Sequence, residues 1–475
     1  MKKTTFFGGL LTLLLLGSCQ DILQEDPKGL MAGESFWTSD GNAVGAINGI
    51  YARPLQNGIG GLDWAFWMET SGLDYGVVGD NAFNMGTWLP TNGNFSLLWS
   101  QSYSCIARAN WALANLPTAQ VEAGLKRRLE GETLFLRAMH YFNLVRSFGD
   151  VPLVLTPTVG TEDVNVARSP SADVYAAIVN DLTKAIDLLP LKSGYAAVDK
   201  GRATKGAAQG LLAKVYLTLK NWQKARELTS AVIQSNEYRL EARYANVWLP
   251  ANDNGPEWLF SYQSAGTNTT SHQTAIWAFP LELNNIDGFS VGFGNLLVSP
   301  RLLALFNPND DRLKTTIWSE YTTNAGRLIK FGRGAASKKY YDVSWNTNYR
   351  FTRVNYPVLR YSDILLMHAE AENELNGPTA EAFARLNQVR GRVGLSALTT
   401  NELPTKDAFL TEVLDERRRE FFNENQRYFD LKRRDLFLAV ARTHPRSQHT
   451  DNAILFPIPQ SEIDINPNLK QNPGY

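Results

Sequence analysis

The sequence predicts a mostly α-helical protein, in which stacked helix pairs form a scaffold and long, irregular, aromatic-rich insertions carry the function. Apolar residues recur at helical spacing over approximately 97–240 and 357–440 of the 475 residues, whereas 29–93 and 251–355 show no sustained periodicity. Aromatic residues make up 11% of the chain and the net charge is zero, so these irregular stretches are expected to be ordered loops. Long ordered loops are usually functional, and we place the ligand-binding surface on them.

The first 18 residues have the layout of an export signal. A basic pair, Lys2 and Lys3, precedes an apolar run from Phe6 to Gly17 that is shorter than the ~20 residues of a membrane-spanning helix. Small residues directly before Cys19 resemble a bacterial lipoprotein box, which implies cleavage before Cys19 and its acylation. Several acyl chains anchor a protein stably to a membrane. The alternative is an ordinary secretory signal with Cys19 as a bystander.

We expect residues 19–28 to form an acylated tether and residues 29–475 to form a single body. No segment after Cys19 approaches the length of a membrane span. The other cysteine, Cys105, cannot pair with an acylated Cys19, so neither a disulfide nor a cysteine-based metal site is expected, and Cys105 is predicted to be buried. Basic and acidic residues number 47 each, which removes the electrostatic case for a nucleic-acid partner.

The clearest helix pair is predicted between Arg202 and Tyr238. One face of its first helix carries apolar residues at the i, i+3, i+4, i+7 spacing: Ala208, Leu211, Leu212, Val215, Tyr216, Leu219 and Trp222. A break at Lys220–Asn221 separates it from a second amphipathic helix. Ala213, Tyr216 and Ala225 match the small and aromatic positions of the tetratricopeptide repeat, whose unit is ~34 residues long.

A second pair is predicted over Tyr361–Arg392, with a break at Asn376–Gly377–Pro378. Short strands are possible at Glu257–Tyr262 and Arg327–Phe331. Further helices are predicted at Leu97–Leu116, Glu132–Arg146, Ala172–Leu189 and Ala408–Glu424. This set is the right size for several stacked helix pairs.

Six ordered segments resemble the SusD/RagB family of outer-membrane nutrient-binding lipoproteins of Bacteroidetes. They are 98–110 (LWSQSYSCIARAN), 132–152 (ETLFLRAMHYFNLVRSFGDVP), 201–204 (GRAT), 359–374 (LRYSDILLMHAEAENE), 415–432 (DERRREFFNENQRYFDLK) and 457–475 (PIPQSEIDINPNLKQNPGY). The resemblance extends over nearly the whole chain. It implies a tetratricopeptide scaffold with irregular loop insertions (a SusD-like fold), tethered by lipid at the cell-surface side of the outer membrane.

The resemblance also implies a function. Such a protein acts as a lid over a SusC-like TonB-dependent transporter and delivers a nutrient, usually an oligosaccharide or polysaccharide and sometimes a peptide. Carbohydrate-specific members bind through aromatic faces on their loops. The alternative from a different class is a protein of the same fold that mainly caps or assembles its transporter, or that binds peptide. A tethered hydrolase ranks last.

Sugar rings present a face of C–H groups that packs on a flat aromatic ring, while their hydroxyls need hydrogen-bonding partners. The candidate aromatic residues are Trp64, Trp67, Tyr75, Trp88, Tyr262, Trp277, Phe279, Trp318 and Tyr321. The candidate polar partners are Asp74, Asp80, Asn81, Asn84 and Asn92. For any single one of these aromatic residues, the favoured interpretation is that it anchors its loop to the helices. We favour Tyr75 and Trp88 as binding residues, because Trp88 precedes a helix in a Gly- and Asn-rich stretch with little local apolar support.

Helical positions place Trp99, Trp111 and Trp222 in the core. No catalytic motif is present: no two of the five histidines lie at i, i+4 spacing, there is no HExxH, and the chain has neither a nucleophile elbow nor a P-loop. A pair of catalytic carboxylates for glycoside hydrolysis is not excluded by the sequence, because the distance between them is set by the folded structure. The family resemblance argues against them. We therefore expect a binding protein without a catalytic residue, cofactor or metal.

Three further features receive structural interpretations. His140 and His368 lie on predicted helices and are expected to be satisfied interior or boundary residues. Asn307–Arg312 offers calcium-type ligands but lacks the Gly and Glu of an EF-hand loop, so it is interpreted as a helix cap. Asp415–Glu420 could be a basic contact patch, but its charges alternate, which favours a solvated helix face with internal ion pairs.

Overall fold

The structure is a computed structural model of the whole chain. The structure describes residues 36–55, 62–77, 81–158, 160, 164–267, 271–272, 274–289, 292–342 and 352–475. The predicted signal, Cys19, the tether and Asp80 lie outside the described residues. No helix in the described part is long and apolar enough to cross a membrane.

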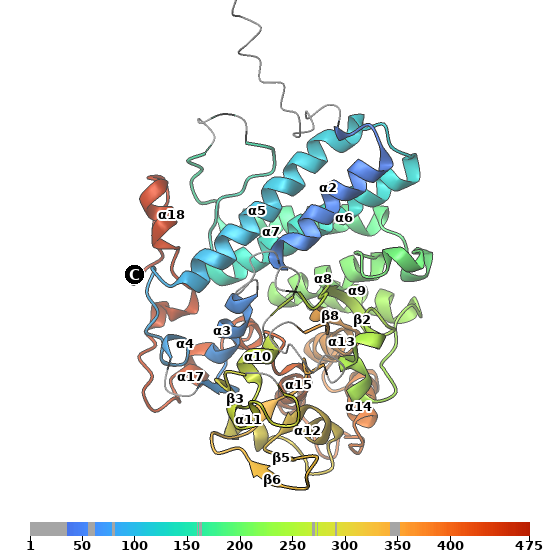
Figure 1. Cartoon of the computed structure of the whole chain (residues 1–475). Coiled ribbons are helices and arrows are strands. Elements are labelled where there is room, and N and C mark those ends of the chain that lie inside the picture. Colours follow the sequence, from blue (N-terminus) through green and yellow to red (C-terminus); the bar gives the residue numbers. More distant parts are fainter. Residues whose placement is uncertain are drawn as a thin grey trace, which may run out of the picture.

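A stack of helices forms the scaffold (Figure 1). Each helix packs on the next from α5 to α9, and α13 then packs on α9, α14 and α15. The bounds are α5 Gly93–Asn115, α6 Ala123–Phe148, α7 Ser171–Leu188, α8 Lys205–Thr218, α9 Trp222–Gln234, α13 Tyr361–Asn376, α14 Ala380–Arg392 and α15 Lys406–Phe421. The mostly helical architecture and the helices predicted from periodicity are confirmed.

The predicted helix pair between Arg202 and Tyr238 is α8 and α9. The Thr204 side chain caps α8 by accepting from the Ala207 backbone N–H at 3.0 Å. Lys220 has a left-handed φ of 58°, and Asn221 then caps α9 through the backbone N–H of Lys224 at 3.1 Å. Fully buried alanines between the two helices let their backbones approach closely. The two helices are therefore separated at Lys220–Asn221, where the sequence predicts the break.

The prediction that 29–93 is mostly ordered loop missed three α-helices. Helix α2 spans Asp40–Ala52, packs on α5 and α6, and buries Ala43, Ile47 and Ile50. Three glycines within it lower helix propensity by about 1 kcal/mol each and weaken the periodic signal, and tertiary packing overrides them. Two further helices lie in this region, α3 at Asp63–Ser71 and α4 at Ala82–Met85.

The second irregular region consists of short elements that pair across long sequence distances. A four-stranded antiparallel sheet has the order β1–β3–β7–β4, and β2 pairs with β8 while β5 pairs with β6. The strands are β1 Tyr75–Val77, β2 Trp258–Tyr262, β3 Leu296–Val298, β4 Ile317–Trp318, β5 Glu320–Thr322, β6 Leu328–Lys330, β7 Ala336–Ser337 and β8 Tyr356–Arg360. The two predicted strands are confirmed as β2 and β6, and the β1–β3 pairing joins the two loop regions.

Short helices complete the chain. The α-helices are α10 Thr274–Ala278, α11 Pro300–Leu303, α12 Asp311–Thr316, α16 Arg427–Arg433, α17 Phe437–Ala441 and α18 Gln460–Ile465. The 3₁₀ helices are η1 Arg53–Leu55, η2 Leu116–Thr118, η3 Lys192–Gly194, η4 Ala197–Asp199, η5 Tyr244–Trp248, η6 Pro250–Asn252, η7 Leu281–Leu283 and η8 Asp451–Ile454.

The charged run Asp415–Glu420 on α15 is buried, so its interpretation as a solvated face is wrong. Glu416 and Glu420 are 0% exposed, and Arg417 and Arg419 are also buried. Helix α15 packs on α13, α14 and α16, and segments of the second loop region cover another side. The predicted ion pairs do form, but they form inside the protein, where opposite charges interact more strongly.

One half of this buried network is centred on Arg312. Its guanidinium lies 2.7 Å from the Asp310 carboxylate, 2.7 Å from Glu416 and 3.1 Å from Glu420. The Asp310 side chain also caps α12 by accepting from the Arg312 backbone N–H at 3.0 Å. The interpretation of Asn307–Arg312 as a helix cap is therefore confirmed.

The other half of the network is centred on Arg360, at the end of β8. Its guanidinium lies 2.6 Å from Glu257, 2.9 Å from Glu420 and 2.7 Å from Glu424. Lys339, which follows β7, contacts the same Glu424 at 2.8 Å. The network thus joins the loop-region sheets to α15 and the segment that follows it.

Replacement of Glu416 tests the network. Burial by itself raises the pKa of this carboxyl group, but Arg312 and Arg419 outweigh burial and hold the pKa at about 2. Because the folded-state pKa is depressed, this stabilisation is complete above the unfolded pKa and is lost as the pH falls. We expect Glu416→Gln to lower the free energy of unfolding by about 3 kcal/mol at pH 7, and by about 2 kcal/mol less at pH 3. Urea denaturation at the two pH values measures both quantities.

The matched control is Glu227→Gln on α9, where the half-exposed carboxylate pairs with Lys224 and accepts from the Gln223 side chain at 3.0 Å. This variant should keep the wild-type denaturation midpoint. An equal loss of stability in Glu416→Gln at both pH values would contradict the assignment.

Candidate functional site

The first candidate binding surface is the Trp277 cluster, which we define as Trp67, Trp277 and Phe293. All three side chains are partly buried. The Trp67 and Trp277 ring centroids lie 5.7 Å apart, and those of Trp277 and Phe293 lie 4.9 Å apart. The cluster brings together α3, α10 and the segment before β3, so both loop regions contribute an aromatic ring.

The second surface is the Trp318 cluster, which we define as Trp318, Tyr321 and Tyr341. These rings are also partly buried, with the Trp318 centroid 6.3 Å from Tyr321 and 5.6 Å from Tyr341. The Lys338 ammonium lies 5.5 Å from the Trp318 centroid, and burial lowers the pKa of this lysine. The Tyr321 hydroxyl donates to the Asp287 carboxylate at 3.0 Å. Charged and hydroxyl groups thus accompany the rings.

Helix α10 and the residue after it connect the two clusters. Trp277 belongs to the first cluster, whereas Phe279 is buried against Trp318 at 5.9 Å. The backbone N–H of Phe293 donates to Ile276 O at 2.9 Å, which fixes Phe293 beside Trp277. A Cβ on Gly292 would lie 2.6 Å from the Phe279 side chain, so only glycine allows this approach. The relative placement of the clusters is therefore set by local backbone contacts.

Trp88, one of the two favoured candidates, is a core residue. Its side chain is 3% exposed, and its indole N–H donates to the Tyr475 hydroxyl at 2.7 Å. Its ring contacts Phe83 and Phe456. The prediction fails because the apolar support missing nearby in the sequence comes from the C-terminal segment.

Tyr75 and Trp64 are also corrected. Tyr75 lies on β1, is 1% exposed and stacks on Phe422 with centroids 6.5 Å apart. Trp64 is buried on α3 within the main hydrophobic core. In the described structure neither ring has a face open to a ligand, so both act as the loop anchors that the sequence left as the alternative.

The polar candidates have structural roles. Asp74 is buried, and the Arg418 guanidinium donates to both of its carboxylate oxygens from Nε at 3.1 Å. Asn81 caps α4 by accepting from the Phe83 backbone N–H at 2.7 Å. Asn84 is buried and donates to Thr70 O at 2.9 Å, and Asn92 caps α5. These four side chains hold the first loop region in place.

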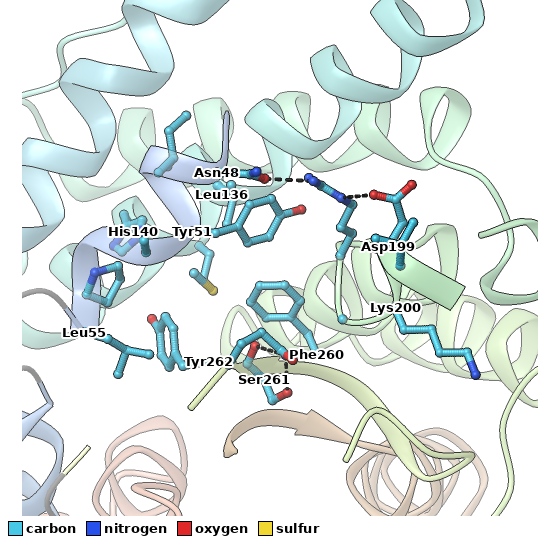
Figure 2. Close-up of a pocket in the computed structure, with 18 residues that line it drawn as sticks. Asn48, Tyr51, Leu55, Leu136, His140, Asp199, Lys200, Phe260, Ser261 and Tyr262 are labelled. Carbon is cyan, nitrogen blue, oxygen red and sulfur yellow. Dashed lines mark hydrogen bonds and ion pairs between the residues drawn. The ribbon is translucent and has the colours of Figure 1, made fainter. Parts of the chain in front are cut away.

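Tyr262 lines a cavity of about 240 Å³ beside α2, α6 and β2 (Figure 2). Phe260 and Tyr262 are two residues apart on β2 and direct their rings to the same side. His140 also lines the cavity. It is 3% exposed, neither of its ring nitrogens has a hydrogen-bond partner among the described residues, and burial lowers its pKa to about 4. The cavity is smaller than most ligand pockets and is too small for an oligosaccharide.

Other predictions have mixed outcomes. Cys105 is buried and unpaired, and burial raises the pKa of its thiol to about 12, as expected for a small core residue. His368 is satisfied by Thr229 and Glu381, whereas His140 is not satisfied. Trp111 is 38% exposed, so its assignment to the core is wrong. Among the described residues, no group of His, Cys, Asp and Glu side chains could hold a metal ion.

Comparison with known proteins decides the family. A model described as the SusD family matches residues 313–475, and a model described as starch-binding associating with outer membrane matches residues 75–217. SusD-like protein P2 of Formosa agariphila is 27% identical over 100% of this chain and 99% of its own length. The chain belongs to the SusD/RagB family.

Solved structures of SusD-like proteins have the same fold. A SusD superfamily protein from Parabacteroides distasonis aligns with a TM-score of 0.80 and 26% identity, over 92% of this chain and 99% of that protein. A laminarin-binding SusD-like protein aligns with a TM-score of 0.79 and 27% identity, over 92% of this chain and 100% of its own. The helical scaffold with its loop insertions is thus that of the SusD superfamily.

Stability measurements separate core from surface tryptophans. We expect Trp88→Ala to lower the free energy of unfolding by about 3–5 kcal/mol, because it leaves a cavity and removes the hydrogen bond to Tyr475. Trp318→Ala should cost clearly less, because its ring is already partly exposed. Guanidinium denaturation followed by circular dichroism measures both. Wild-type stability of Trp88→Ala would show that this residue is not a core anchor.

Proposed function

We propose that this protein binds an oligosaccharide or polysaccharide through the Trp277 and Trp318 clusters. The observation that carries the proposal is that both loop regions, far apart in sequence, bring partly buried aromatic rings together on a scaffold of the SusD superfamily. Flat rings suit the C–H faces of sugars, and the adjacent Lys338, Asp287 and Tyr321 suit hydroxyl groups. A glycan fits this combination better than a fully apolar ligand does.

Related proteins support this choice of ligand. One matching family model is described as starch-binding, and one of the SusD-like structures is that of a laminarin-binding protein. Both names refer to polysaccharides. They favour a sugar over a peptide as the ligand class of this protein. Starch and laminarin themselves are ligands named for those proteins only.

We further propose that the protein works at the outer membrane as the lid of a SusC-like TonB-dependent transporter, to which it delivers the bound glycan. Membership of the SusD/RagB family supports this role, and so does the description of one matching model as associating with the outer membrane. Acylation of Cys19 would hold the protein at that membrane. The second candidate is a protein that mainly caps or assembles the transporter, or that carries peptide.

Affinity electrophoresis tests the glycan proposal. The chain from residue 20 onward contains every described residue and is run through native gels that each hold one polysaccharide from a broad panel. We expect retardation in at least one gel. Trp67→Ala, Trp277→Ala and Trp318→Ala should each weaken binding by about 2- to 12-fold, which corresponds to the ~0.5–1.5 kcal/mol of one aromatic contact.

The matched control is Trp111→Ala, which removes an exposed tryptophan from the scaffold helix α5 and should leave retardation unchanged. Uniform mobility of the wild type across the panel would contradict glycan binding. If the protein then still co-purified with a SusC-like barrel from its native membrane, the capping role would be favoured.

Acylation is tested by metabolic labelling with an alkyne analogue of palmitate in a bacterium that processes lipoproteins. We expect the wild type to be labelled and to sediment with membranes. Cys19→Ala should be unlabelled and recovered in the soluble fraction, because the acceptor thiol is gone. Cys105→Ala serves as the control, since that buried thiol should not be acylated. Equal labelling of Cys19→Ala and the wild type would rule out this anchor.

A further inference from the structure

A second, larger cavity of about 540 Å³ lies on the helical scaffold, where α6 ends. Its walls come from the scaffold helices α6, α7 and α8, from α16, and from the segments that follow them and the C-terminal segment: Val145, Arg146, Gly149, Asp150, Arg168, Ser171, Tyr175, Thr218, Lys220, Phe429, Lys432, Arg433, Asp435, Leu455, Asn472 and Pro473. It shares no residue with the Trp277 or Trp318 cluster. Ligand binding in this cavity is therefore independent of glycan binding by the loops.

The cavity is strongly basic, although the protein as a whole is neutral. Five basic side chains line it against only two acidic ones. The charges of Lys220 and Arg433 are balanced, since Lys220 pairs with Asp435 and Arg433 pairs with Glu370 and Asp430. The second acidic side chain, Asp150, accepts from the backbone N–H of Ser171 at 2.7 Å.

The other three basic side chains, Arg146, Arg168 and Lys432, form no ion pair with any carboxylate among the described residues. Arg168 donates instead to neutral oxygens, namely backbone carbonyls and the side-chain oxygen of Asn472 at 2.6 Å. Elsewhere in this protein, buried basic groups such as Arg312 and Arg360 lie against carboxylates. Asp150 and Asp430 act on Arg168 and Arg146 from a distance, but no carboxylate among the described residues is in ion-pair contact with any of these three side chains.

Arg146 is held rigidly at the cavity wall. Its guanidinium carbon lies 3.6 Å from the Phe429 ring centroid and 4.8 Å from that of Phe142. One Nη2 hydrogen bond, at 2.6 Å, goes to Asn143 Oδ1, whereas its Nε has no partner among the described residues. Stacking of this kind fixes the plane of a guanidinium and leaves its edge to bind an oxyanion.

Lys432 lies next to Arg146, because its ammonium group donates to the Arg146 backbone carbonyl. Burial lowers the pKa of Lys432 to about 7, with a further contribution from the charge of Arg146. Burial also lowers the pKa of Arg146 to about 10. Two adjacent positive charges disfavour one another, and an anion placed between them would stabilise both.

We propose that this cavity is a binding site for an oxyanion, the carboxylate, sulfate or phosphate group of a small molecule, which Arg146 and Lys432 contact directly. Arg168 adds a third positive charge. The remaining wall includes Tyr175 and Leu455, which leave an apolar surface for an attached organic group. This site would give the protein a second binding function. Its ligand is recognised by negative charge, whereas the aromatic clusters suit neutral sugar rings.

Isothermal titration calorimetry tests this site with the chain from residue 20 onward. Phosphate, sulfate and glucuronate are titrated at pH 6 and constant ionic strength, with chloride and glucose as negative controls. We expect saturable binding of one equivalent of at least one anion and none of glucose. Lys432→Gln and Arg146→Gln should each weaken this binding at least tenfold, whereas Lys432→Arg, which keeps the charge, should retain it.

Lys224→Gln is the matched control, since it removes an exposed lysine from α9 outside the cavity and should bind as the wild type does. If glucuronate binds more tightly than phosphate and sulfate, the ligand is an anionic sugar. If phosphate or sulfate binds at least as tightly as glucuronate, the ligand is the free oxyanion. Both outcomes support the site. The proposal is overturned if the wild type binds none of the three anions, or if a folded Lys432→Gln binds as tightly as the wild type. If Lys432→Gln does not fold, a folded Arg146→Gln decides the matter by calorimetry, and anion binding as tight as that of the wild type overturns the proposal.

Discussion

The rest of the structure depends on the buried charges of α15. Glu420 is fully buried and is bound by Arg312, Arg360 and Arg392, which arrive from three different segments. Burial raises the pKa of Glu420, and these three guanidinium groups together bring it well below its ordinary value. Removing one partner of such a buried group typically costs about 3–5 kcal/mol, so the docking of these three segments makes a large contribution to stability.

This constraint also positions the candidate binding surface. Arg312 lies in the first turn of α12, just before β4 and Trp318, and Arg418 on α15 binds Asp74, next to β1 in the first loop region. The loops that carry the two aromatic clusters are therefore fastened to the scaffold by ion pairs as well as by apolar contacts. A rigid base of this kind lets partly exposed rings keep their mutual geometry when no ligand is bound.

Sequence patterns predicted much of the scaffold, and the failures have identifiable causes. The helix pairs α8–α9 and α13–α14 were predictable because periodicity, caps and breakers all agree within each ~34-residue unit. Helix α2 was missed because its glycines dilute the apolar pattern. The run Asp415–Glu420 was assigned to the surface because alternating charges are typical of exposed helices. Its partners are distant in sequence: Arg312 is 104 residues from Glu416, and Asp74 is 344 residues from Arg418.

The sequence by itself determined the fold class, the family resemblance and the loop regions in which the aromatic candidates lie, because these follow from local periodicity and motif order. Only the tertiary structure decided which aromatic rings are core and which stay partly open. Trp88 is covered by Tyr475, and Trp277 is placed beside Trp67 by contacts between separate loops. The unbalanced charges of Arg146 and Lys432 likewise emerge only when α6 and α16 meet. Exposure and charge balance depend on distant partners, which a local pattern does not encode.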